Sequence, residues 1–283
     1  MNKILKLVNK IEELEAEIEA EEKNILRSAN LQLQSKLEAN DEETLAIQKK
    51  IIDRQEIDFK SCDLFRPESI KKLDAILEKL FGKVFKNSDS EHWLLFSAIS
   101  SSERKVSRIL EIGTADGVTT ALLASLFPKS EVVTIDLPIT DNEFKNSYNR
   151  KNVVNEMVKN RNDLINQFDN IKFVETNSVK LHNWADKSFD IIWVDGAHGY
   201  PVLPLDLHNA IRLIRENGVI VVDDVFIKLR KIDKMYRSTA AIDTLKLLKE
   251  NNLIRDFTLF RKRLLLRYNF KDLNEKFLGF IQF

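Results

Sequence analysis

The chain has 283 residues, enough for one or two domains. Its 44 basic and 44 acidic residues give a net charge near zero, which offers no electrostatic case for nucleic-acid binding. A single cysteine, Cys62, excludes an internal disulfide, and no apolar run approaches the roughly 18 residues that a membrane span needs. The N-terminus does not have the pattern of a signal peptide, because Lys6, Asn9 and Lys10 interrupt its apolar positions. These features predict a cytoplasmic protein.

The first 58 residues predict a helical, coiled-coil-like segment. Residues 3–58 contain neither glycine nor proline, and the a/d spacing of a coiled coil is followed by Ile4, Leu7, Ile11, Leu14 and Ile18. An isolated narrow apolar stripe on a charged helix needs a partner, which is either another chain or this chain's own domain. Of these two, self-association is favoured, so we expect a homo-oligomer.

Residues 59–105 read as a helical lead-in, and residues 106–283 read as one α/β domain. Expected strands cover 108–112, 131–136, 171–175, 190–195, 218–223, 257–266 and 276–283. The first five alternate with helices, and the last two suggest a hairpin at the sheet edge. This order predicts a doubly wound, mostly parallel, seven-stranded Rossmann-like sheet that helices cover on both faces.

The strongest local signal is the sequence LEIGTADG, which follows the first strand and opens a helix. Gly113 lets the backbone turn sharply and approach a ligand, and Gly117 admits the ligand where the helix begins. The helix N-terminus offers free N–H groups to an anion, and Thr119 can add a hydroxyl donor. Glu111, at the end of the strand, can hold an ammonium directly or through water. Thr114 lies within the same loop.

The second strand ends in Asp136, which lies 19 residues after Gly117. An acid at this place can accept hydrogen bonds from both hydroxyls of a ribose. Folds that bind NAD share this acid, but a dinucleotide fingerprint reads G-x-G-x-x-G, and this loop has one glycine too few.

These motifs resemble those of class I S-adenosylmethionine (SAM)-dependent methyltransferases. The resemblance rests on LEIGTADG, TIDLP, FDIIWVDGAHGYPVLPLD and GVIVVDDV, covers about 120 residues strongly, and leaves out the first 100. Within the class the chain is similar to the sugar O-methyltransferases of the macrocin type, and more distantly to catechol O-methyltransferase. The resemblance implies SAM as cofactor and places Asn177 and Ser178 near its adenine.

Three further acids follow the later strands. Asp195 ends the fourth, and Asp223 and Asp224 end the fifth, so all three are expected at the carboxyl edge beside the cofactor. Carboxylates this close repel one another unless they are protonated or bind a cation, and oxygen ligands favour Mg²⁺, or else Mn²⁺. The resemblance implies the same metal site. Alternatively, Asp195 serves the cofactor alone and the other two merely cap the strand.

His198 follows Asp195 by three residues, between two glycines. Its ordinary pKa suits proton abstraction near neutral pH, and the resemblance places the candidate base in this loop. A substrate-binding or supporting role is the alternative. His92, His182 and His208 lack such a setting and are interpreted as structural.

Together these residues predict methyl transfer from SAM to a hydroxyl of a sugar or glycosylated molecule, assisted by a metal that a vicinal diol chelates. Asp195 and His198 would form the catalytic pair. One alternative is a metal-independent methyltransferase that acts on nitrogen, a phenol or a protein. The other is a coiled-coil scaffold with an inert SAM fold.

Overall fold

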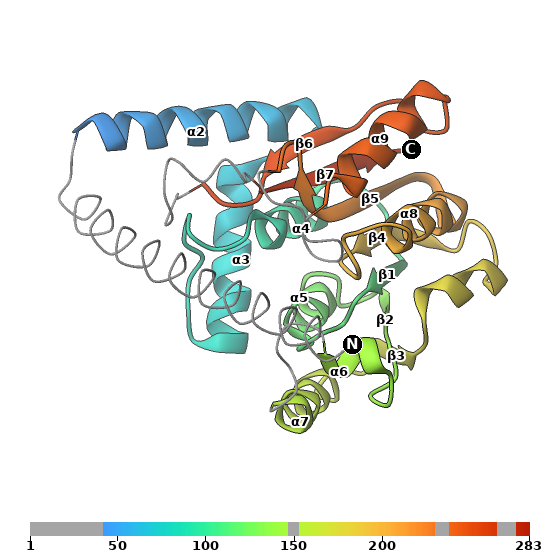
Figure 1. Cartoon of the computed structure of the whole chain (residues 1–283). Coiled ribbons are helices and arrows are strands. Elements are labelled where there is room, and N and C mark those ends of the chain that lie inside the picture. The colour runs from blue at the N-terminus through green and yellow to red at the C-terminus, as the bar shows by residue number, and fades with distance from the viewer. Residues whose placement is uncertain (1–41, 147–152, 230–237, 265–275) are drawn as a thin grey trace, which may run out of the picture. The chain divides into compact units, whose positions relative to one another are not determined.

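The computed structural model describes residues 42–146, 153–229, 238–264 and 276–283 (Figure 1). The chain divides into two compact units: residues 1–51 with 265–272, and residues 52–264 with 273–283. The predicted coiled-coil seam, from Ile4 to Ile18, lies outside the described residues, so the seam and the homo-oligomer stay predictions. The second unit carries the sheet, and the fold that follows is its fold. None of the described helices is both long and apolar enough to cross a membrane.

A seven-stranded sheet forms the centre of this unit, in the order β3-β2-β1-β4-β5-β7-β6. Its strands are β1 (Arg108–Ile112), β2 (Glu131–Asp136), β3 (Ile171–Glu175), β4 (Phe189–Val194), β5 (Ile214–Phe226), β6 (Thr258–Arg261) and β7 (Lys276–Gln282). The first five pair in parallel, and β7 runs antiparallel between β5 and β6. The predicted doubly wound sheet, with its hairpin at one edge, is therefore confirmed. Its strand order reverses between β1 and β4, where such folds open a crevice at the carboxyl ends of the strands.

Helices cover both faces of the sheet because its central strands are apolar on both sides. Along β1, Ile109 enters one buried cluster and Leu110 enters the other, since successive side chains of a strand point to opposite faces. The helices are α2 (Glu42–Ser61), α3 (Arg66–Phe81), α4 (Glu91–Ser101), α5 (Val118–Leu126), α6 (Asn142–Asn146), α7 (Val154–Ile165), α8 (Val202–Leu213) and α9 (Ala240–Glu250), with the 3-10 helix η2 (Ser178–Asn183). Side chains of α3, α4 and α5 join the first cluster, and those of α8 and α9 join the second.

The predicted helical lead-in packs inside the same compact unit as the sheet. Leu73, Leu77 and Phe96 are fully buried in the cluster that contains Trp193 of β4. The ring of Phe59, at the end of α2, lies 4.8 Å from the ring of Phe260 on β6. The lead-in therefore covers one face of the sheet and shares its core.

Candidate active site

A pocket of about 400 Å³ opens at the carboxyl ends of β1, β2, β3 and β4, which suits a small-molecule ligand. Among the residues predicted to bind the cofactor, those that line it are Gly113, Asp136, Asn177, Ser178 and Asp195. The pocket wall also includes Phe144 of α6, which is buried. Strand ends that are far apart in sequence thus converge on one cavity, as the topology predicts.

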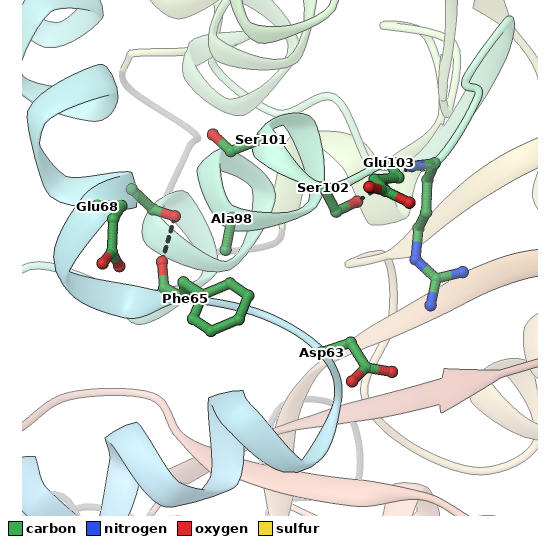
Figure 2. A pocket seen from close by; sticks show the side chains of 9 residues that line it. Asp63, Phe65, Glu68, Ala98, Ser101, Ser102 and Glu103 are labelled. Carbon is green, nitrogen blue, oxygen red and sulfur yellow. Dashed lines mark hydrogen bonds between the residues drawn. The ribbon is translucent and has the colours of Figure 1, made fainter.

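A larger hollow, of about 890 Å³, lies elsewhere on this unit, between α3, α4 and the turn after α2. Figure 2 shows the acids Asp63, Glu68 and Glu103 around it, with the ring of Phe65. Glu103 precedes β1, so this hollow reaches the amino ends of the strands, opposite the crevice where doubly wound sheets bind ligands. The smaller pocket is therefore the candidate cofactor site.

Both loop glycines adopt left-handed backbone conformations, with φ of +100° at Gly113 and +77° at Gly117. A Cβ at Gly113 would lie 2.3 Å from the backbone oxygen of Asp195, so the turn crosses directly over the end of β4. A Cβ at Gly117 would lie 2.9 Å from Cγ2 of Ile165 on α7. The missing side chain of Gly117 therefore makes room for α7, and its contact with the ligand stays a prediction.

Glu111 is fully buried beneath the loop and does not line the pocket. Its Oε2 accepts hydrogen bonds from the hydroxyls of Thr120 and, at 2.6 Å, Thr134, whereas its buried Oε1 has no hydrogen-bond partner among the described residues. Burial raises the pKa of Glu111 to about 8, although the two hydroxyls act to lower it. The predicted Thr114 also lies below the pocket, where its Oγ1 is 2.6 Å from Oγ1 of Thr134.

Asp136 joins the cofactor loop to the second strand. Its Oδ2 accepts a 2.8 Å hydrogen bond from the backbone N–H of Ala115, and its Oδ1 accepts one of 2.8 Å from Leu137. These contacts orient the carboxylate at the pocket wall. At the end of β3, Asn177 caps η2 by accepting a 3.0 Å bond from the N–H of Val179. This cap fixes the wall where the adenine is expected.

Asp223 and Asp224 do not end β5, as the sequence suggested, because β7 extends the pairing of β5 to Phe226. The register against β7 shifts between Val222 and Val225, and Asp224 has a φ of +47°. In a regular strand two successive side chains point to opposite faces, and a bulge re-aims one of them. Both carboxylates consequently face one amino group.

That amino group belongs to Lys262, which the sequence interpretation missed. Its Nζ donates to Oδ2 of Asp223 at 2.6 Å and to Oδ1 of Asp224 at 2.7 Å, and Lys276 also pairs with Asp224. Burial would raise the pKa of Asp223, but the Lys262 ammonium outweighs it and holds that pKa below its ordinary range. Burial and the neighbouring Asp223 carboxylate raise the pKa of Asp195.

His198 is almost fully buried next to this pair, with its Nε2 3.7 Å from Oδ1 of Asp195. Burial lowers the pKa of His198, so its imidazole is neutral near pH 7 and can accept a proton. Its Nδ1 has no hydrogen-bond partner among the described residues. Asp195, His198 and Asp223 each offer one ligand atom, all within 4.8 Å of one another. Asp224, the third predicted ligand, is not part of that group.

His92 reaches the same site from α4, although it was interpreted as structural. Its ring stacks on Trp193 at 5.1 Å, and its Nε2 lies 3.3 Å from the hydroxyl of Thr119, the predicted cofactor contact. Burial lowers the pKa of His92 to about 3, although the charges of Asp223 and Asp224 act to raise it. No sequence motif predicts that His92 lies at this site, because it is on a helix outside the recognisable motifs.

The lead-in also fixes Lys262. The N–H of Glu91, at the start of α4, donates to the carbonyl of Lys262 at 2.8 Å, and the N–H of Lys262 donates to the carbonyl of Lys276 at 2.9 Å. The Glu91 carboxylate is fully buried and accepts hydrogen bonds of 2.9 and 3.0 Å from the buried guanidinium of Arg66. A buried ion pair between α3 and α4 thus anchors the end of β6 at the site.

Residues 110–225, which contain the cofactor loop, the pocket and all the acids of the cluster, match the family model Methyltransf_24, described as a methyltransferase domain. These residues form a class I SAM-dependent methyltransferase domain. The predicted enzyme class, Rossmann-like fold and SAM cofactor agree with this assignment. The narrower resemblance to macrocin-type sugar O-methyltransferases stays a prediction.

Solved methyltransferase structures resemble this chain at low sequence identity. The N-methyltransferase NodS from Bradyrhizobium japonicum WM9 is 16% identical, with a TM-score of 0.46, over 68% of this chain and 94% of that one. The O-methyltransferase TomG from Streptomyces achromogenes, in complex with SAM, is 18% identical, with a TM-score of 0.45, over 80% of this chain and 95% of that one. At these values, neither an acceptor nor a site residue is transferred from those enzymes to this one.

Proposed function

We propose that this SAM-dependent methyltransferase transfers its methyl group to a hydroxyl oxygen, on a sugar or a glycosylated small molecule. The observation that carries the proposal is the neutral, buried imidazole of His198 beside Asp195, at the edge of the cofactor pocket. A sugar hydroxyl must lose its proton as it attacks, whereas a neutral amine can attack through its lone pair. A buried proton acceptor next to the pocket therefore favours oxygen over nitrogen. The sugar follows only from the resemblance to macrocin-type enzymes.

In the proposed reaction, the acceptor oxygen attacks the SAM methyl group in line, the new C–O bond forms and the C–S bond breaks. The products are S-adenosylhomocysteine, the methyl ether and a proton, which His198 takes up and returns to solvent. A positioned base of this kind contributes roughly 10²–10⁴-fold to the rate. Asp136 would orient the ribose, and Asn177 and Ser178 would border the adenine. Glu111, which lies beneath the loop, would hold the ammonium through water.

The predicted Mg²⁺ or Mn²⁺ site is only partly present in the described residues. Asp195, His198 and Asp223 could share one cation, which would polarise the acceptor oxygen. The predicted set of Asp195, Asp223 and Asp224 does not fit, because Lys262 lies between the last two and Lys276 holds Asp224 as well. The proposed reaction therefore contains no metal step.

The test is the chemical identity of the product. Full-length protein is incubated with SAM carrying a ¹³C-labelled methyl group and a panel of sugars, glycosides, phenols and amines. Labelled O-methyl products in the NMR spectrum, from sugars or glycosides, are the expected result. His198→Ala should lose most of kcat but keep affinity for S-adenosylhomocysteine, while the exposed His182→Ala serves as a matched control.

If the only labelled products were N-methyl amines or methyl ethers of phenols, the alternative acceptors, nitrogen or a phenol, would be favoured over a sugar. Failure of the wild-type chain to bind either SAM or S-adenosylhomocysteine would instead favour the inert scaffold. Near wild-type turnover of His198→Ala at neutral pH would show that another group, or water, takes the proton.

A further inference from the structure

The acidic cluster, which consists of Asp195, Asp223 and Asp224, already contains a buried cation. That cation is the side-chain ammonium of Lys262. The side chain of Lys262 is only 11% exposed, and those of its partners Asp223 and Asp224 are 5% and 10% exposed. Two neighbouring carboxylates that share one positive group are the arrangement in which carboxylate sites hold a divalent cation. Here the ammonium takes that place, at 2.6 and 2.7 Å.

The position of this ammonium is fixed from three directions. The bulge in β5, with its left-handed Asp224, turns both carboxylates toward Lys262. The backbone of Lys262 is bonded on one side to Glu91 and on the other to Lys276. Lys276 adds a second ammonium to Asp224 from the partner strand β7. The contacts come from three separate parts of the chain, so the ammonium is built into the site.

One oxygen of the cluster remains open to a metal. Oδ1 of Asp223 is buried without a hydrogen-bond partner among the described residues. Asp223 also belongs to the group with Asp195 and His198, in which each residue offers one ligand atom. A divalent ion bound there would share Asp223 with the ammonium of Lys262. Two like charges on one carboxylate repel strongly at low effective dielectric, so the ion and the ammonium compete.

We propose that Lys262 is the resident cation of this site, and that its ammonium keeps Mg²⁺ and Mn²⁺ out of it. The inference rests on the proposed function, because it concerns the reaction site of that enzyme. Lys262 acts through Asp223 and Asp224, which makes it a positioning residue. The reason to expect a vicinal diol then falls away, since a single acceptor hydroxyl needs no second oxygen to chelate a metal.

The test measures Mn²⁺ binding by electron paramagnetic resonance on full-length protein freed of metal with EDTA. Mn²⁺ binding is assigned to this site only where the substitution Asp223→Asn abolishes it. Wild type should show no such Asp223-dependent binding at equimolar Mn²⁺. Lys262→Met keeps an unbranched side chain without the ammonium, and it should bind Mn²⁺ at least about tenfold more tightly than wild type. Lys249→Met removes an exposed ion pair with Asp256 and should behave as wild type.

Thermal melting provides a second readout, which also covers a variant that folds poorly. Lys262→Met leaves two buried carboxylates without their partner, so its melting temperature should fall, and Mn²⁺ should restore part of the loss. Lys262→Arg keeps the charge, so Mn²⁺ should leave its melting temperature unchanged. If Lys262→Met does not fold at all, Mn²⁺ binding by wild type or by Lys262→Arg would still overturn the proposal.

Mn²⁺ binding by wild type that Asp223→Asn abolishes would overturn the proposal. So would a folded Lys262→Met variant that binds no Mn²⁺, because Lys262 would then not be what excludes the metal. S-adenosylhomocysteine is titrated into the same samples. If wild type binds S-adenosylhomocysteine, the proposed function is retained whatever the Mn²⁺ result. If wild type does not bind it, the proposed function is refuted independently of the Mn²⁺ result.

Discussion

The buried carboxyl of Glu111 predicts that cofactor binding depends on pH. Burial raises the pKa of Glu111 to about 8, and its Oε1 has no hydrogen-bond partner among the described residues. With that pKa, roughly nine tenths of the molecules carry the Glu111 proton at pH 7. If Glu111 receives the ammonium of the cofactor, the carboxyl must first lose its proton. Binding is then linked to proton release.

The size of the effect follows from this pKa. When only the ionised form binds, the affinity is divided by one plus the ratio of protonated to ionised Glu111. That divisor is about 100 at pH 6, about 11 at pH 7 and about 4 at pH 7.5. The affinity should therefore rise about ninefold between pH 6 and 7, with about 0.9 proton released per ligand at pH 7.

Calorimetry with S-adenosylhomocysteine measures both quantities, because the heat in buffers of different ionisation enthalpy reports the protons released. Glu111→Gln should bind more weakly, release no such proton and lose the pH slope. Glu143→Gln, an exposed acid in the pocket wall, is the matched control and should keep the slope. An equal affinity of wild type at pH 6 and 7, or a slope that survives in Glu111→Gln, would refute the reasoning.

Three further changes test other parts of the chain. Asp136→Ala should weaken S-adenosylhomocysteine binding by roughly 10- to 100-fold in calorimetry, since hydrogen bonds to a charged group are lost, and unchanged affinity would contradict its ribose role. Arg66→Met should lower the free energy of unfolding by about 3–5 kcal/mol in urea denaturation, because Glu91 stays buried without its partner. The double variant Arg66→Met/Glu91→Leu should recover part of that loss, whereas a single-variant cost near zero would show that the pair is not needed. Deletion of residues 1–41 should lower the mass per particle in light scattering but leave cofactor binding intact, and an unchanged number of chains per particle would argue against self-association through this segment.

The sequence determined the elements whose signals are local. The strands 108–112, 131–136 and 171–175 were predicted with the bounds that the structure has. Apolar runs that end in glycine or an acid depend on near neighbours in the chain, so they can be read without knowledge of the fold. The parallel sheet followed from the alternation of strands and helices, and it brought Gly113, Asp136 and Asp195 to one pocket.

The tertiary structure decided which groups share a charge or a proton. Lys262 lies 39 residues from Asp223, directly after β6, in a segment whose sequence shows no functional motif. His92 reaches the site from a helix that the motifs leave out, and it meets Thr119 27 residues later in the chain. Such contacts arise only after β7 inserts between β5 and β6 and the lead-in packs on the sheet.

The acidic cluster shows most clearly which features follow from the sequence and which depend on the tertiary structure. The sequence brought Asp195 and Asp223 close together, because the parallel strands β4 and β5 are neighbours in the sheet, but it wrongly ended β5 at the two acids. It could not place the β5 bulge, since a bulge depends on the pairing partner β7. Nor could it show that an ammonium enters between the two carboxylates, because pKa values and ion pairs depend on distances and burial that only the packed chain defines.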